Sequence, residues 1–248
     1  MSDFKKYLYC VISTDEPMVF DMPGMGGAGR VYTVNFNDIA MVVSDSSADR
    51  FSLSRENLLT HQKVLEEVMQ YFTLLPVKFG THAESAEDIQ EYVLKKRYSE
   101  FKETINYFNG KNQMSLKVLW TDMSEVYREI IQTNPTIKKL RDAAMSGRGG
   151  SRNDLIEIGR YLEQELAGKK EAERDRTVKA LKKYAHRIKL KDNYGDEMFV
   201  NANFLIEQSK QEQFDVLLGQ IAETYGSRAF FKYVGPIPPY DFIQIFIN

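Results

Sequence analysis

Cysteine is nearly absent from this sequence of 248 residues, which contains a single one, Cys10. One thiol excludes an internal disulfide framework and any zinc site built from several cysteine ligands, a pattern that fits a reducing compartment. Cys10 has aromatic and aliphatic neighbours, and a free thiol in such surroundings is usually a small buried hydrophobe. We therefore expect Cys10 to pack in a core.

Long apolar runs and a large net charge are missing too. No stretch approaches the roughly 18 apolar residues that a membrane span needs, and the apolar run within residues 1–11 is too short for a signal peptide. The 33 basic residues nearly balance the 35 acidic ones, so the chain has no overall field that attracts nucleic acid or an anionic membrane. We expect a cytoplasmic protein of two modest domains or one large one.

No recognisable catalytic or metal-binding motif is present. The three histidines, His61, His82 and His186, form no pair at metal-ligand spacing, and no nucleophile stands in the context of a known catalytic element. His61 precedes Glu66 by five residues, which puts the two side chains on diverging faces of a helix, so we interpret His61 as a surface histidine. The sequence therefore predicts no catalytic residue, no cofactor, no metal and no enzymatic activity.

One glycine-rich segment imitates a nucleotide-binding motif. Gly24, Gly26 and Gly29 have the spacing G-x-G-x-x-G, but a dinucleotide site needs the first glycine at the end of a strand and the last at the start of a helix. Here the segment leads from Pro23 into a predicted strand that begins at Val31. A flexible connector between strands is favoured over a phosphate site.

Periodicity, caps and turns predict the elements of the first half. Strands are expected at residues 4–13, 31–35, 39–44, 74–79 and 114–120, and helices begin after Ser54 and Ser85. Pro76 lacks an amide donor and places its strand at a sheet edge or near the start of a strand. This order favours an α+β domain close to a ferredoxin-like sandwich, with the helices on one face and the glycine-rich segment in place of the first helix.

The second half begins with a helical stretch at residues 122–145, interrupted at Asn134-Pro135, and a glycine-rich joint at 146–151. We therefore expect an N-terminal domain at residues 1–145 and a C-terminal α+β domain at 146–248. A long helical segment from Arg152 carries two apolar stripes as far as Ile188, and residues 167–177 between them are predicted to bend or to be solvated on all sides. A strand at 197–207, a helix opened by a Ser209–Glu212 capping box and a strand at 228–234 follow.

Two surfaces are candidates for partner contact. Residues 152–191 contain 12 basic and 7 acidic residues, and this excess of positive charge makes Lys182 and Arg187 candidate contacts. A solvated helix face is the favoured interpretation, with nucleic-acid binding as the alternative. The apolar tail can join its own sheet, dock between the domains or pair with another protein, and docking on its own chain is favoured. Its candidate contact residues are Tyr240, Phe242, Ile245 and Phe246.

Several segments together carry a resemblance to a known family. They are Tyr7-Leu8-Tyr9, Val31-Tyr32-Thr33, residues 38–44, 61–69, 75–81, 116–120, 156–160 and 200–206, and the sequence Lys232-Tyr233-Val234-Gly235-Pro236-Ile237-Pro238-Pro239-Tyr240-Asp241-Phe242. In this order and spacing they resemble the gas vesicle protein F/L family (GvpF/GvpL) along nearly the whole chain.

The resemblance implies a ferredoxin-like N-terminal domain, a C-terminal α+β domain and no catalytic residues. It implies a minor component of the gas vesicle that binds the small hydrophobic shell protein, and other gas vesicle proteins beside it, and that assists nucleation or formation of the vesicle wall. Neither nucleic acid nor a lipid membrane is then a partner, and the location is the cytoplasm, in association with the vesicle. The alternative is a basic-helix nucleic-acid-binding protein or a general adaptor.

Overall fold

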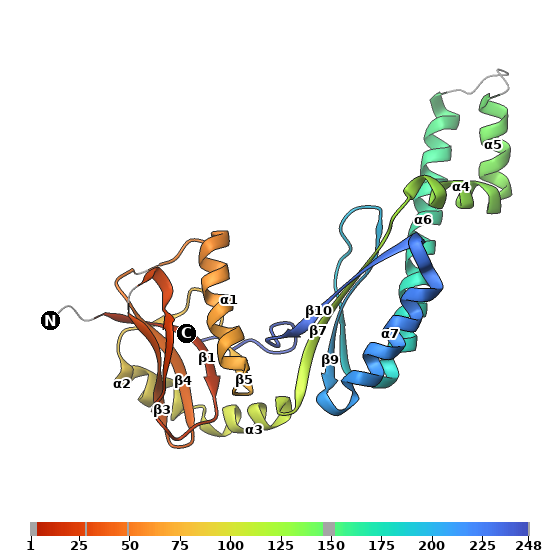
Figure 1. Ribbon diagram of the computed structural model, residues 1–248. Coiled ribbons are helices and arrows are strands. Elements are labelled where there is room, and N and C mark those ends of the chain that lie inside the picture. Colours follow the sequence, from red (N-terminus) through yellow and green to blue (C-terminus); the bar gives the residue numbers. More distant parts are fainter. Residues whose placement is uncertain (1–3, 28, 49, 146–151, 248) are drawn as a thin grey trace. The chain divides into compact units, whose positions relative to one another are not determined.

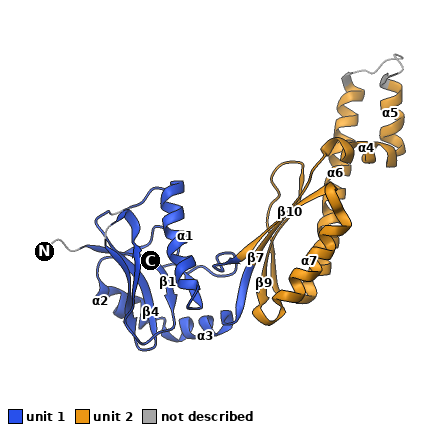
Figure 2. Ribbon diagram, in the orientation of Figure 1, with its two compact units in different colours: residues 1–113, 236–248 blue, residues 114–235 orange. Residues whose placement is uncertain are grey.

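The chain forms two compact units. The computed structural model describes residues 4–27, 29–48, 50–145 and 152–247. Unit 1 comprises Met1–Gln113 and Pro236–Asn248, and unit 2 comprises Met114–Gly235, coloured blue and orange in Figure 2. This division differs from the predicted boundary at residues 145 and 146, whose joint at 146–151 lies outside the described residues. The helices before residue 145 pack on the helix after it, and the end of the chain returns to unit 1.

Unit 1 is built on a six-stranded sheet (Figure 1). Its strands are β1 (Lys5–Ile12), β2 (Val19–Pro23), β3 (Arg30–Phe36), β4 (Ile39–Ser46), β5 (Leu74–Pro76) and β6 (His82–Ala83). The order is β2-β3-β4-β1-β5, and β6 also pairs with β1. The predicted hairpin of β3 and β4 is confirmed, and Asn37 adopts a positive φ of 52° in its turn. Strand β2 was not predicted, because Pro17 and Pro23 made its segment read as a loop.

Helices cover both faces of this sheet, whereas the sequence led us to expect them on one face. They are α1 (Arg55–Met69), α2 (Ala86–Asp88), the π-helical η2 (Ile89–Leu94) and α3 (Tyr98–Phe108). Ser54 and Ser85 cap α1 and α2 as predicted, each accepting a hydrogen bond from the third residue after it. Figure 1 shows α1 and α2 on opposite sides of the sheet. Strands β1 and β4 are accordingly apolar and buried at successive positions.

Unit 2 contains a four-stranded sheet in the order β10-β7-β9-β8. Its strands are β7 (Lys111–Trp120), β8 (Ala185–Leu190), β9 (Met198–Glu207) and β10 (Ala229–Ile237). Two predictions are wrong here. Strand β7 belongs to this sheet and not to the N-terminal one, and residues 185–190 form β8 where the helix was expected to continue. The spacing of Ala185 and Ile188 suits a helix. In the structure, however, β8 pairs along β9, and both residues pack against the core from this strand.

The helices of unit 2 are α4 (Met123–Thr133), α5 (Pro135–Met145), α6 (Arg152–Leu181) and α7 (Gln211–Tyr225). The predicted break at Asn134-Pro135 is confirmed. Helix α6 is continuous through residues 167–177, and Thr177 is 1% exposed, so this stretch is not solvated on all sides. The capping box at Ser209 does not form, because a short 3₁₀ turn, η4 (Gln208–Lys210), precedes α7.

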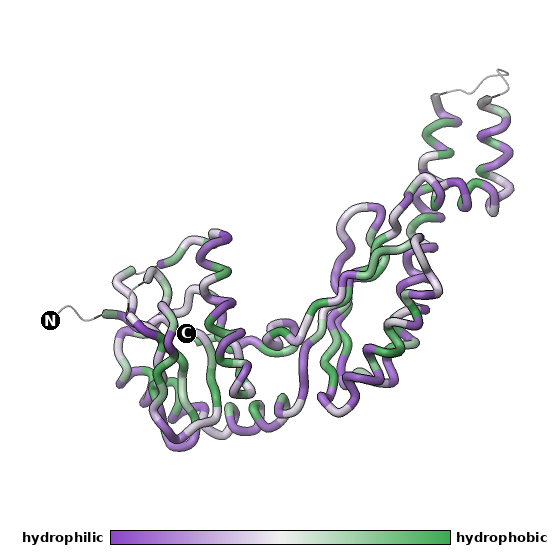
Figure 3. Tube along the Cα trace, viewed as in Figure 1, coloured by the Kyte–Doolittle hydropathy of each residue, from purple (hydrophilic) through white to green (hydrophobic). Residues whose placement is uncertain are grey.

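Both units have their own apolar core. The helices alternate between hydrophilic and hydrophobic residues along their length (Figure 3), as amphipathic helices on a sheet do. Cys10 is fully buried in the core of unit 1, as predicted, and burial raises the pKa of its thiol. Among the described helices, none is long and apolar enough to cross a membrane.

The glycine-rich segment is packed against the core of unit 1. Met25, at the start of the 3₁₀ turn η1 (Met25–Gly27), is fully buried, and its amide donates to the hydroxyl of Tyr9 at 2.8 Å. That hydroxyl also lies 2.9 Å from Oγ of Ser44. A Cβ atom on Gly24 would stand 2.2 Å from Cβ of Ser44. Gly24 therefore permits a close approach of the loop to β4, which explains its glycine without a bound phosphate.

We predict that Gly24→Ala lowers the free energy of unfolding by roughly 1 to 3 kcal/mol, because the added methyl group overpacks this contact. The matched control is Gly219→Ala in α7, where nothing lies within 4 Å of the new Cβ. This control should raise stability by up to about 1 kcal/mol through helix propensity. Urea unfolding of the two variants measures both changes, and equal effects of the same sign would contradict the assignment.

Candidate functional site

Buried polar groups link β1 to α1 inside unit 1. The backbone amide of Gly80 donates to the hydroxyl of Tyr7 at 3.1 Å, and this hydroxyl lies 3.0 Å from Nδ1 of His61. Tyr7 is fully buried and His61 is 5% exposed. We assign the Tyr7 hydroxyl as the donor to Nδ1, because this direction gives the buried phenol proton an acceptor. This assignment puts the proton of the neutral imidazole on Nε2, which becomes a hydrogen-bond donor.

His61 is neutral across the physiological range. Burial lowers its pKa from 6.5 to about 4, because the charged imidazolium loses its hydration in the interior. The prediction of a surface histidine is therefore wrong. His61 shares the buried face of α1 with Val64, Leu65 and Val68, at the intervals of three, four and seven residues that mark one helix face. That periodicity was visible in the sequence, and it carried more information than the spacing to Glu66.

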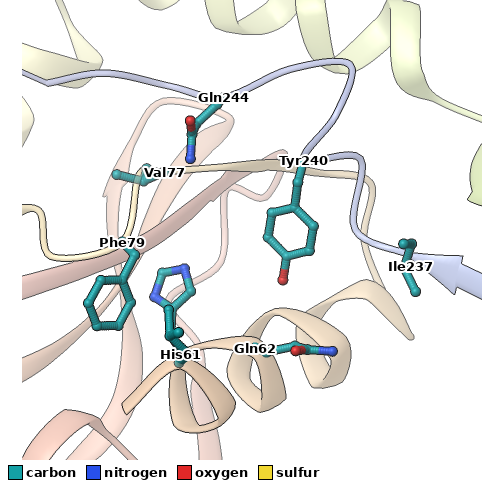
Figure 4. A pocket seen from close by; sticks show the side chains of 8 residues that line it. His61, Gln62, Val77, Phe79, Ile237, Tyr240 and Gln244 are labelled. Atoms are coloured by element: carbon teal, nitrogen blue, oxygen red, sulfur yellow. The ribbon is translucent and has the colours of Figure 1, made fainter. Parts of the chain in front are cut away.

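A pocket of about 450 Å³ opens over His61 (Figure 4). Three segments of unit 1 form its wall: α1, the residues that follow β5, and the C-terminal tail. The lining residues are Leu58, His61, Gln62, Val77, Phe79, Ile237, Tyr240 and Gln244. Burial raises the pKa of the Tyr240 hydroxyl, so this group stays protonated. The pocket offers an apolar wall with a few neutral hydrogen-bonding groups, which suits an uncharged or apolar side chain more than an ion.

The C-terminal tail completes this pocket by docking on the end of β5. The amide of Ile245 donates to the carbonyl of Pro76 at 2.8 Å, and the amide of Lys78 donates to the carbonyl of Ile245 at 3.0 Å. Val77 and Ile245 thus form a parallel bridge. The prediction that the tail docks on its own sheet is confirmed, and the edge position predicted from Pro76 is confirmed with it.

Further polar contacts fasten the tail to unit 1. The side chain of Gln113, 1% exposed, donates to Oδ2 of Asp241 at 2.7 Å and accepts from the Asp241 amide at 3.1 Å. Nη1 of Arg97 donates to the carbonyl of Phe246 at 2.9 Å. These contacts hold both ends of the tail segment that walls the pocket.

The six residues predicted to contact a partner lie in different surroundings. Ile245 is 2% exposed and belongs to the fold, while Phe246 is 56% exposed. Tyr240 and Phe242 are half-buried, and only Tyr240 lines the pocket. Lys182 and Arg187 are exposed in unit 2, in the turn η3 (Lys182–Tyr184) and in β8. The structure describes four of the six together in unit 1 and the other two in unit 2.

The described residues contain no group of three or more His, Cys, Asp or Glu side chains that could hold a metal ion. Burial keeps His61 in its neutral form by lowering its pKa. The lining of the pocket provides apolar contact, the side-chain amides of Gln62 and Gln244, and the imidazole of His61.

Comparison with known proteins places the chain in a family. The model described as "Gas vesicle synthesis protein GvpL/GvpF" matches residues 5–244. The chain belongs to the GvpL/GvpF family. It is 27% identical to gas vesicle protein F of Dolichospermum flosaquae over 241 residues, which cover 96% of this chain and 97% of the relative. It is 26% identical to gas vesicle protein F1 of Halobacterium salinarum, with 98% and 94% of the two chains covered.

Solved structures of GvpF have the same fold. The crystal structure of GvpF from Anabaena sp. PCC7120 superposes with a TM-score of 0.86 at 26% identity, covering 98% of this chain and 99% of that one. GvpF from Microcystis aeruginosa gives a TM-score of 0.78, also at 26% identity, and covers 98% and 100%. The α+β fold class and the family resemblance read from the sequence are both confirmed.

We predict that His61 makes the stability of the chain depend on pH. Its folded pKa of about 4 lies below the unfolded value of 6.5, so the unfolded chain binds a proton between these values that the folded chain does not. The free energy of unfolding therefore falls as the pH drops through this window, with a share from His61 of about 2 kcal/mol between pH 7 and pH 5.

His61→Gln removes the titrating group, and its amide oxygen can still accept from Tyr7. Urea unfolding at pH 7 and pH 5 should show a smaller loss of stability for this variant than for the wild type. The same loss in both proteins would show that His61 is not the titrating group.

Proposed function

We propose that this chain is a gas-vesicle assembly protein that binds the small hydrophobic shell protein and assists nucleation or formation of the vesicle wall. The observation that carries the proposal is the match to the gas vesicle synthesis family over residues 5–244. Curated relatives named gas vesicle protein F cover the same length, which supports a role of the whole chain. The role is structural, without a catalytic step, in the cytoplasm and in association with the vesicle.

The surface around the pocket of unit 1 suits such a partner. Leu58 and Leu59 on α1 are 42% and 44% exposed, and Phe246 of the tail is 56% exposed. Phe79 lines the pocket and also the neighbouring hollow that Phe246 borders. Exposed apolar groups around a pocket are typical of a protein interaction site. A small hydrophobic subunit has apolar surface that must be covered before it joins a wall, because exposed apolar surface aggregates.

The predicted contact residues take different roles in this proposal. Tyr240 and Phe246 contact the shell protein directly, Tyr240 in the pocket wall and Phe246 beside it. Ile245 and Phe242 hold the tail in place. Lys182 and Arg187 form a separate, charged contact on unit 2, for the shell protein or for other gas vesicle proteins.

We predict that the double variant Leu58→Asp and Phe246→Asp weakens association with the shell protein at least tenfold. Both substitutions put a carboxylate on apolar contact surface, where its desolvation opposes binding. The matched control is Leu155→Asp with Ile156→Asp, since these residues are 59% and 62% exposed on α6 of unit 2. Co-purification of the shell protein with the tagged full chain measures the difference. Equal retention by the two variants would remove the pocket surface from the proposal.

A second experiment tests the role in the cell. Deletion of the gene should abolish buoyant vesicles in the host, because the wall would not be nucleated or extended. Complementation with the wild-type chain should restore flotation, and the Leu58→Asp and Phe246→Asp variant should restore less than the control. Normal vesicles in the deletion strain, with no association between the two proteins, would overturn the proposed function.

A further inference from the structure

The two faces of the sheet in unit 2 differ in what covers them. One face carries the side chains of Leu116, Val118, Phe231 and Tyr233, which pack in a core shared with α6 and α7. Because successive side chains of a strand point to opposite faces, Lys117, Leu119, Phe230, Lys232 and Val234 lie on the other face. These residues do not belong to the core that α6 and α7 share. We call this second face the open face.

The open face exposes apolar groups on its edge strand. Phe230 is 58% exposed and Val234 is 44% exposed, and both lie on β10 with Lys232 between them. The two apolar side chains are four residues apart in an extended strand, a distance of roughly 13 Å. A helix rises by 1.5 Å per residue, so roughly this distance separates two residues that lie seven or eight positions apart on one side of a helix. The two groups are thus spaced to receive two apolar positions of one helix face that lie two turns apart.

The charge of the open face is positive. Arg187 and Lys189 on β8 pair with Leu205 and Asn203 on β9, and cross-strand partners lie on the same face. Leu205 and Asn203 are absent from the core that the helices share, and they alternate with Ala202, Phe204 and Ile206, which belong to it. Both are nevertheless buried, at 0% and 2% exposure, so the exposed part of the open face lies on the strands beside β9.

Four basic residues therefore share the open face: Lys117, Arg187, Lys189 and Lys232. Alternation along the four described strands places one acidic residue on this face, Glu207 at the end of β9. Glu207 forms an ion pair with Lys210 at 2.8 Å. Arg187 and Lys189 also interact with other groups, so the positive charge beside the apolar groups is that of Lys117 and Lys232. This charge is complementary to a partner with acidic residues.

We propose that the open face of unit 2 binds an amphipathic helix of a partner protein, with an apolar stripe that contacts Phe230 and Val234 and with Asp or Glu residues on both sides of the stripe. A helix there would complete a second helical layer on the sheet, an arrangement that buries both faces. The proposal goes beyond binding of the shell protein at unit 1, because it rests on unit 2 alone. A single-stranded nucleic acid is the less favoured occupant, because its bases stack on successive aromatic side chains. Outside the helix-covered core, alternation along the described strands places one aromatic residue on the open face, Phe230.

The test uses the full chain and three labelled probes in fluorescence anisotropy. The first probe is a synthetic helical peptide with leucine at heptad spacing and glutamate on both flanks, the second has lysine in place of glutamate, and the third is a single-stranded oligonucleotide. We expect the glutamate peptide to bind at least tenfold more tightly than the lysine peptide, and its affinity to fall as salt rises.

Charge reversal then locates the binding surface. Lys117→Glu with Lys232→Glu should weaken binding of the glutamate peptide at least tenfold. Lys138→Glu with Lys139→Glu makes the same change of charge at exposed positions of α5 and should alter it less than twofold. Phe230→Ser is a second test that keeps the charge, and it should weaken binding several-fold while the melting temperature stays near that of the wild type.

Three outcomes would overturn the proposal. They are equal binding of the two peptides, equal effects of the two charge reversals, and tight binding of the oligonucleotide alone. If the full chain does not bind the shell protein but still binds the glutamate peptide, the result contradicts the proposed function and leaves the proposal for this surface standing.

Discussion

The return of the C-terminal tail to the edge of β5 is the contact on which the rest of the architecture depends. Chain segments far apart in sequence close unit 1 through the bridge between Val77 and Ile245 and the paired hydrogen bonds of Gln113 and Asp241. Unit 2 is therefore an insertion, which the chain enters along β7 and leaves along β10. These two strands are neighbours in one sheet, so the backbone pairing that builds unit 2 also holds together the two ends of the insertion.

The elements that the sequence predicted are those fixed by local chemistry. Ser54 and Ser85 cap helices through hydrogen bonds within one turn, Asn37 turns a hairpin, and Gly226 ends α7 with a positive φ of 55°. Strand β7 illustrates what local chemistry leaves open. Its alternating pattern marks a strand, but the choice between two sheets depends on β9 and β10, more than 75 residues later in the chain. The division of the chain into units was missed for the same reason.

The candidate site was only partly predictable from the sequence. The apolar tail was identified from its composition, and docking on its own chain was favoured because an exposed apolar strand is an aggregation hazard. That it docks on the strand carrying Pro76 is seen only in the structure. His61 was missed, although it shares a helix face with Val64 and Leu65. A histidine on an apolar face needs a buried partner, and that partner, Tyr7, comes from 54 residues earlier in the chain. The sequence shows the face but not the partner, so the neutral imidazole became visible only in the structure.

The two sheets also show how burial shapes sequence. In unit 1 helices cover both faces, and β1 and β4 are apolar at successive positions. In unit 2, β7 and β10 alternate between core residues and residues such as Lys117 and Lys232, whereas β9 is buried at every position but its last. The alternation therefore marks the strands of this sheet whose second face is partly exposed. The pocket of unit 1 is formed differently, because its wall includes the C-terminal tail that completes the unit. A side chain that fills the pocket contacts α1 and the tail together, so binding there stabilises the closed unit, increasingly so as the partner's concentration rises above its dissociation constant.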